Sequence, residues 1–274
     1  MIPDAEFHEV NFIPEQPWFV LNSCSNYVFA FSKNPAISHY YTFTTQNEVV
    51  HSLAIPDGCI DILFDCTPDS PSTIICGTTL QATSVSFGKN RKYFGVRFKA
   101  GLVPKFIDAH AFDLISNQVD LKDVFIKGND ICDLISKKNN IFEQVHVIES
   151  YFEGFEMKSI SNLSKTLLAI IKDGGGNLKV KNLSDLTGFT PRTLQRQFLQ
   201  DIGLPPKLFC RILRIQSAID LIITNKNLCF TDVALTLGFS DQSHFLREFK
   251  KSVNSTPSGF KSLNFSEKLF HVSC

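Results

Sequence analysis

The chain has 274 residues, of which 43% are hydrophobic, and its 27 basic and 27 acidic side chains give a formal net charge of zero. This hydrophobic content excludes a disordered chain, and the length suits two domains of ordinary size. The charge is unevenly distributed along the chain: residues 175–263 contain twelve Lys and Arg but six Asp and Glu. That segment carries +6 and the remainder −6, so the C-terminal part can attract a polyanion although the whole chain does not.

The cysteines form neither a C-x-x-C motif nor a paired spacing with histidine: Cys24, Cys59, Cys66, Cys76, Cys132, Cys210, Cys229 and Cys274. We therefore expect reduced thiols, with no metal and no cofactor. The N-terminus lacks a basic stretch followed by an apolar one, and no apolar run is long enough to span a bilayer. A cytoplasmic protein with no membrane partner is expected.

Residues 1–100 are expected to form a mainly antiparallel β domain, because β-prone runs alternate there with turn signals. The expected strands span residues 38–43, 59–64, 73–76, 83–87 and 93–98. Two of them alternate apolar residues on one face: Ile60, Ile62 and Phe64, and Phe94, Val96 and Phe98. We expect these faces to line an apolar interior, where Arg97 or Lys99 supplies a cation for a carboxylate. Aromatic side chains that simply fill the interior are the alternative.

Residues 101–158 have a helical pattern, with apolar residues at spacings of 4, 3, 4 and 3: Ile141, Val145, Ile148, Phe152 and Phe155. This stripe fits either a helix packed on its own domain or the seam of a dimer, and the second reading assigns these five residues to dimerisation. A further helix is expected over residues 161–172. The glycine triplet after it lacks the Gly-Lys-Ser/Thr of a phosphate loop, so it predicts a helix terminus.

The last 95 residues contain an internal near-repeat, in which residues 183–190 are matched fifty residues later by residues 233–240. Each copy predicts a short helix closed by Gly, then an aromatic residue, then Thr190 or Ser240 as the cap of a second helix. Pro191 falls at the first position of that second helix, where its missing N–H costs nothing. Helix, glycine turn and capped helix form a helix-turn-helix, whose second helix enters the major groove of DNA.

Spacing separates the two faces of each second helix. Leu194 and Phe198, and likewise Phe245 and Phe249, are four residues apart and should face a core. The outward side chains are the candidates for DNA contacts: Arg192, Thr193, Gln195, Arg196, Gln242, Ser243, His244, Arg247 and Lys250. A single basic face is usually only solvated, but two copies with matched turns favour base readout, since Arg and Gln pair bidentately with guanine and adenine.

Residues 205–224 contain many apolar residues and no internal Gly, with Pro only at the start, so they predict a long helix between the two copies. Twenty residues extend about 30 Å. That length is close to the roughly 34 Å between successive major-groove faces, so one chain can occupy both.

Residues 160–263 resemble the DNA-binding domain of the AraC/XylS family of transcription regulators. The resemblance rests on residues 194–206, on the helix 214–222, and above all on residues 233–257, which nearly reproduce the family signature. It implies a structural role in the two units for Leu186, Gly188, Leu194, Phe198, Gly203, Pro206, Ala234, Gly238, Phe239, Phe245, Phe249 and Pro257. Asn254 departs from the usual Gly, but Asn is the next best residue for a left-handed helix end.

Residues 55–64 and 94–101 resemble, less specifically, a β domain that precedes this module in related regulators. The resemblance implies a cupin-like fold with a sensory or oligomerisation role. The expected class is therefore α+β: a β domain over residues 1–100, a helical linker or dimerisation segment over 101–158, a DNA-binding domain over 159–263 and a tail over 264–274. The expected function is a non-enzymatic transcription regulator, an activator, with promoter DNA and RNA polymerase as partners, a small-molecule effector and a homodimeric state.

Three alternatives remain open. An Ada-like repair protein would use a zinc-bound cysteine, yet Cys24, Cys59, Cys66 and Cys76 offer no closely spaced pair. A metal-dependent cupin enzyme would need grouped histidines, whereas His39, His51 and His110 have no H-x-H spacing. An architectural DNA binder would show weak sequence preference and no effector response. Asp57, Asp61 and Arg97 can form a charged cluster, for which a structural salt bridge is the default reading.

Overall fold

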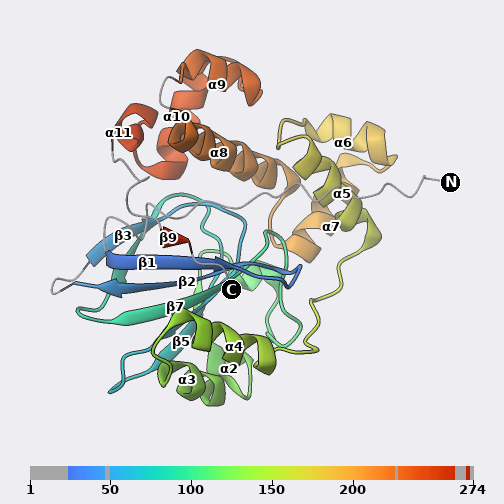
Figure 1. Cartoon of the computed structure of the whole chain (residues 1–274). Helices are drawn as coiled ribbons and strands as arrows, with labels where there is room; N and C mark the ends of the chain where they lie inside the picture. Colours follow the sequence, from blue (N-terminus) through green and yellow to red (C-terminus); the bar gives the residue numbers. More distant parts are fainter. Residues whose placement is uncertain (1–23, 47–49, 226–227, 263–269, 272–274) are drawn as a thin grey trace.

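The computed structural model describes residues 24–46, 50–225, 228–262 and 270–271 (Figure 1). Its strands are β1 (Cys24–Phe31), β2 (Ile37–Thr45), β3 (Val50–Ala54), β4 (Asp61–Asp65), β5 (Ser72–Cys76), β6 (Thr83–Phe87), β7 (Lys92–Phe98), β8 (Gln118–Asp120) and β9 (Phe270–His271). Its helices are η1 (Ala111–Leu114), α2 (Leu121–Val124), α3 (Gly128–Ser136), α4 (Ile141–Tyr151), α5 (Asn162–Asp173), α6 (Val180–Thr187), α7 (Pro191–Ile202), α8 (Pro206–Thr224), α9 (Phe230–Thr236), α10 (Gln242–Val253) and α11 (Pro257–Lys261).

The N-terminal half is built on a seven-stranded sheet in the order β8-β5-β4-β7-β2-β1-β9, with a separate two-stranded sheet of β3 and β6. Neighbouring strands are antiparallel except β1 and β9. We call residues 24–158 the β domain, because β8 pairs with β5 and carries the sheet past residue 100. The α+β class and the five expected strands are confirmed, whereas β1, β3, β8 and β9 were not expected.

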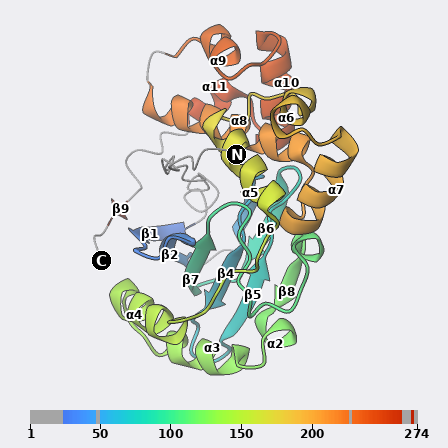
Figure 2. The same cartoon turned by 90° about the vertical axis from the view of Figure 1, so that its right-hand side faces the viewer.

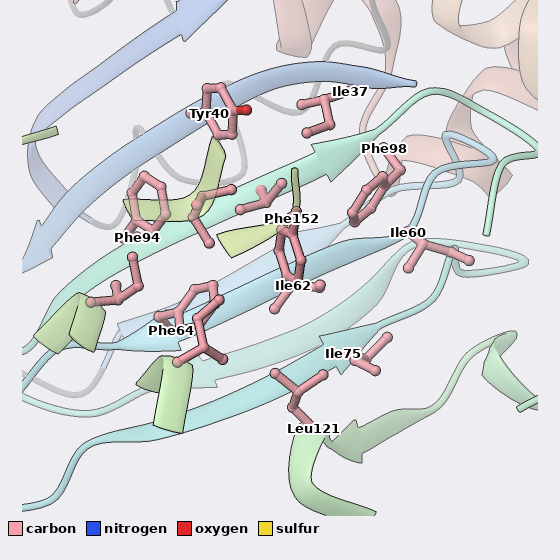
Figure 3. Close-up of a cluster of buried hydrophobic side chains, with 14 of the residues drawn as sticks. Ile37, Tyr40, Ile60, Ile62, Phe64, Ile75, Phe94, Phe98, Leu121 and Phe152 are labelled. Atoms are coloured by element: carbon pink, nitrogen blue, oxygen red, sulfur yellow. The ribbon is translucent and has the colours of Figure 1, made fainter. Parts of the chain in front are cut away.

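Helices α2, α3 and α4 cover one face of the large sheet, on the side away from the C-terminal helices (Figure 2). Figure 3 shows the cluster that results, in which strand residues such as Ile62, Phe64 and Phe94 are gathered with Leu121 and Phe152. These three strand residues are fully buried. The alternating apolar faces expected to line an interior therefore pack under helices instead, because α2–α4 supply the apolar partner.

The stripe considered as a dimer seam belongs to this cluster. Ile141, Val145, Ile148 and Phe152 are each at most 8% exposed and contact the sheet of their own chain. Phe155 lies beyond α4, 37% exposed, with its ring 5.1 Å from that of Phe106. For the first four residues the assignment to dimerisation is therefore wrong, because one chain already buries them, and the reading of a helix packed on its own domain holds. Phe155 is the exposed end of the stripe.

The C-terminal helices α5–α11 form a second domain, residues 161–262, above the opposite face of the sheet (Figure 2). The expected long helix is α8, and the helix expected over 161–172 is α5, capped by Ser161. Gly176, with φ of 74°, follows α5 so close to α8 that a Cβ would lie 2.3 Å from the Cys210 carbonyl oxygen. The glycine triplet is thus a helix terminus, as predicted. None of the described helices is long and apolar enough to cross a bilayer.

Replacing Ile148 with alanine should lower the free energy of unfolding by about 2–5 kcal/mol, because the side chain is fully buried between α4 and the sheet. The matched control is Phe142→Ala on the same helix, where the side chain is 50% exposed. Urea denaturation followed by circular dichroism measures both. Equal and small losses of unfolding free energy in the two variants would contradict the packing described. A change in the oligomeric state of Ile148→Ala without a loss of stability would instead support the dimer seam.

Candidate nucleic-acid interface and internal cavity

The first helix-turn-helix consists of α6, a turn at Gly188 and α7. Gly188 has φ of 74°, a left-handed conformation that favours glycine. Thr190 caps α7, since its hydroxyl accepts from the Thr193 amide at 3.3 Å. Leu194 and Phe198 of α7 are fully buried. Leu186 is 64% exposed, so its structural assignment is wrong; α6 is only two turns long and buries Leu183 against α7 in its place.

The second unit repeats this geometry with α9, Gly238 and α10. Gly238 has φ of 67°, and the end of α10 at Asn254 has φ of 57°, which confirms the predicted left-handed Asn cap. The cap at the start of α10 is Asp241, whose carboxylate accepts from the His244 amide at 2.7 Å. Ser240, the expected cap, instead donates to Asp241. The Asp241 carboxylate is favoured over the Ser240 hydroxyl as this cap, because its negative charge also interacts with the positive end of the helix dipole.

The other structural residues lie as the motif requires. Phe245 and Phe249 are fully buried, and Phe239 is 4% exposed. The remaining ones, also buried, are Gly203, Pro206, Ala234 and Pro257. Arg214 of α8 fixes the second turn, because its guanidinium lies 4.5 Å above the Phe239 ring and donates to the Gly238 carbonyl oxygen at 3.2 Å.

Most of the predicted contact residues form an exposed polar face on α7 and α10: Arg192, Gln195, Arg196, Gln242, Ser243, Arg247 and Lys250. Thr193 and His244 are half-buried at the starts of their helices. The Thr193 hydroxyl lies 3.0 Å from that of Thr190, and the His244 ring lies 3.1 Å from the Ser240 hydroxyl. The structure therefore brings the two sets onto corresponding faces of two matched helices joined by α8.

A cavity of about 460 Å³ lies inside the β domain, between the large sheet and β6. Its walls include Tyr41, Phe43, Leu63 and Tyr93, which alternate with the buried apolar residues under the helices. Lys99 does not reach it. The cavity is therefore lined by the opposite face of the strands from the one expected, and that face carries charge.

Arg97 lies on the cavity wall and is held by two carboxylates. Its Nε and Nη2 donate to Asp61 at 2.8 and 2.6 Å, and its Nη1 lies 3.0 Å from Asp57. Burial opposes the charge, but the two aspartates outweigh it and hold the pKa of Arg97 above its usual value. This is the structural salt bridge given as the default reading of the cluster. Arg97 is thus engaged and is not a free cation for a carboxylate.

The turn that carries Asp57 also supports the second domain. The Pro56 carbonyl oxygen accepts a hydrogen bond from Gln216 of α8 at 2.8 Å, and Gln216 is 1% exposed. Gly58, with φ of 75°, lies against Phe209, where a Cβ would be 3.1 Å from the ring. Sequence reasoning missed Gln216. The sequence did contain a signal for it, because Gln216 is a polar side chain within the apolar run that predicts the long helix.

Within the described residues, the His, Cys, Asp and Glu side chains form no group of three or more that could hold a metal ion. Burial raises the pKa of the Cys66 and Cys76 thiols to about 12, and that of Cys59 well above its usual value. Such thiols stay protonated and are poor nucleophiles. Cys24 and His51 lie outside the side chains that the structure describes. Nothing in the described part of the chain supports the repair-protein alternative.

A helix-turn-helix domain family matches residues 183–262. RhaS, a transcriptional activator of Escherichia coli, is 35% identical over 75 residues, which are 27% of each chain. The family match covers less than a third of the chain and lies on α6–α11, the part whose sequence resembles the DNA-binding domain of the AraC/XylS family. The chain spans about a quarter of the length of the curated relatives it matches. Residues 34–120 match a separate family described as a domain of unknown function (DUF6597).

Two solved structures are also similar. ToxT from Vibrio cholerae aligns with 83% of this chain and 98% of its own, at 11% identity and a TM-score of 0.47. The DNA-binding domain of AdpA, a global transcriptional factor solved with a target DNA, aligns with 39% of this chain and 97% of its own, at 19% identity and a TM-score of 0.36.

Acid should destabilise the β domain through His39. Burial, reinforced by Arg97, lowers the pKa of His39 from 6.5 to about 3, so the folded state stays neutral while the unfolded state protonates below pH 6.5. The unfolded state then binds more protons, and the stability from neutral His39 is lost by up to about 1.4 kcal/mol per pH unit as pH falls from 6.5 towards 3.

The His39→Gln variant should show a flatter dependence of stability on pH across this window than the wild type. The control is His146→Gln, at an exposed position of α4. Urea titrations at half-unit pH steps measure the slopes. Identical slopes for wild type and His39→Gln would contradict a neutral, buried His39.

Proposed function

We propose that the chain is a sequence-specific transcription regulator that binds DNA with α7 and α10 in successive turns of the major groove. The observation that carries the proposal is the pair of capped second helices with exposed Arg and Gln side chains, joined by one continuous helix. Its 19 residues extend about 28 Å, close to the roughly 34 Å of one duplex turn. The +6 charge of residues 175–263 favours the same partner.

The exposed residues divide by chemistry. Arg196, Gln195 and Arg247 suit base edges, because their planar groups pair bidentately with guanine or adenine, while Lys250 suits a phosphate. Arg192, Gln242 and Ser243 lie at the helix starts and complete the set. Thr193 and His244 are engaged in capping and act by holding the helix starts in position.

The proposal that the chain activates transcription rests on the resemblance to the AraC/XylS family and on the similarity to RhaS, which is described as a transcriptional activator. We infer an activator that works with RNA polymerase, in the bacterial cytoplasm on the nucleoid, without catalysing a reaction. The domain limits proposed are a β domain that ends near residue 158 and a DNA-binding domain from about residue 161. A homodimer would need a surface other than the buried stripe on α4.

The Arg196→Ala variant should lose about 1–3 kcal/mol of specific affinity and relax the preference at one base position, because Arg196 is exposed on α7 and bears on a base edge. Selection from a random duplex pool with the wild type supplies the site, and fluorescence anisotropy at fixed salt measures the affinities. Lys137→Ala, at an exposed position of the β domain, is the matched control. Unchanged affinity and unchanged base preference in a folded Arg196→Ala protein would refute the assignment.

A second proposed function, ligand sensing, is favoured by the cavity. Its lining carries Asp57, Asp61 and Asp65 and one arginine, Arg97, which is already paired with the first two. Asp65 is paired with Arg91 at 2.6 Å, so the lining as a whole retains one negative charge. An anionic ligand would meet unfavourable charge there. Aromatic rings such as Tyr41 and Phe43 instead suit a flat, neutral or cationic molecule, so the carboxylate effector expected from the sequence is replaced by this class.

A thermal-shift screen of the full chain with matched amines, amides and carboxylates tests this class. A ligand at a hundred times its dissociation constant adds about 2.7 kcal/mol of stability, and an effector must also change the affinity for DNA. Val85→Trp, which places bulk on the cavity wall at β6, should remove the shift. Stabilisation by carboxylates alone, or equal stabilisation of the Val85→Trp protein, would contradict the proposal.

A further inference from the structure

A second hollow lies between the two domains, beside α10. It measures about 500 Å³ and is lined by Arg247, Lys250, Lys251 and Asn254 of α10, with Gln81 and Ala82 of the loop between β5 and β6. All the polar side chains in this lining are exposed. The β5–β6 loop therefore forms a wall of the hollow without covering the cations. We call it the interdomain groove.

The interdomain groove is positively charged, and its lining contains no acid. Among the described residues, no carboxylate lies within the 4.0 Å ion-pair distance of Arg247, Lys250 or Lys251. The acidic residue of α10, Glu248, is directed to α8, where it lies 3.7 Å from Arg211. Three cations are thus available to one anionic partner.

The groove continues the face of α10 that is proposed to contact DNA. Ser243, Arg247, Lys250 and Asn254 follow one another at spacings of 4, 3 and 4, so they share one side of the helix. The four-residue step from Arg247 to Lys251 extends about 6 Å along the helix axis. Successive phosphates of one DNA strand follow at about 3.4 Å of duplex axis, so this length fits two neighbouring phosphates.

From this arrangement we propose that the interdomain groove binds the phosphate backbone of duplex DNA, and that the β domain, through Gln81, is part of the DNA interface. The inference rests on the proposed function of α10. The Gln81 side-chain amide donates to a phosphate oxygen from one wall, while Lys250 and Lys251 neutralise the charge from the other. Proteins commonly contact the phosphates of the DNA backbone with cations and with uncharged donors such as Gln side by side.

The test changes one charge in the groove of the full chain. The probes are two fluorescent 30-base-pair duplexes, one selected by the wild type and one of random sequence, titrated over a range of salt concentrations. Gln81→Lys should tighten binding to both about 3- to 10-fold at low salt and steepen the salt slope by about 0.9, since each phosphate neutralised contributes that amount. Gln81→Glu should weaken both, and Lys251→Ala should lower the slope by about 0.9.

Ser70→Lys and Ser70→Glu are the matched controls, because Ser70 is exposed in the turn at the other end of β5, more than a Debye length away at 0.15 M salt. At 0.15 M salt, both should bind as the wild type does, and the Gln81 variants are compared with them at that concentration. If the wild type binds neither duplex, the proposed function itself fails. If the wild type binds but the Gln81 and Lys251 variants match it, or if Gln81→Glu binds more tightly, the β domain is not part of the interface and this inference is overturned.

Discussion

A guanidinium enclosed in the β domain is the constraint on which the arrangement of the two domains depends. The side chains of Arg97 and Asp57 are 6% and 4% exposed, so the charge of Arg97 must be neutralised from within the chain. Removing one partner of such a buried pair costs about 3–5 kcal/mol. Asp61 comes from the neighbouring strand β4, but Asp57 comes from the turn before it. The ion pair therefore fixes the position of a turn as well as the pairing of two strands.

That turn is where the helical domain rests. Gln216 of α8 donates to the Pro56 carbonyl oxygen, and Phe209 packs where Gly58 has no side chain. Apolar clusters also cross the boundary, since Cys59 and Ala100 pack with α5, α7 and α8. The turn that supports α8 thus also contributes Asp57 to the wall of the cavity.

The sequence was most informative where a local, repeated motif determines the local structure by itself. The repeated Gly turns gave both helix-turn-helix units, and Asn254 was correctly expected as a left-handed helix end. Alternation along a strand such as β4 shows that it has two unlike faces, but not which face a helix will cover, because residues 121–151 far along the chain decide that. Gln216 was missed for the same reason, since its partner at Pro56 is 160 residues away.

The two helix-turn-helix units are held by different parts of the chain. In the first, α7 ends at Gly203, so close to η1 that a Cβ there would lie 2.7 Å from the Ala111 carbonyl carbon. In the second, Arg214 of α8 covers Phe239, whose counterpart Phe189 in the first unit is 47% exposed. The first unit thus contacts the β domain through η1. The second is held by α8, which itself rests on the 56–58 turn, and by an apolar cluster that it shares with the β domain. Both supports belong to one sheet-based domain, so the β domain holds the two units at either end of α8, the continuous helix that separates them.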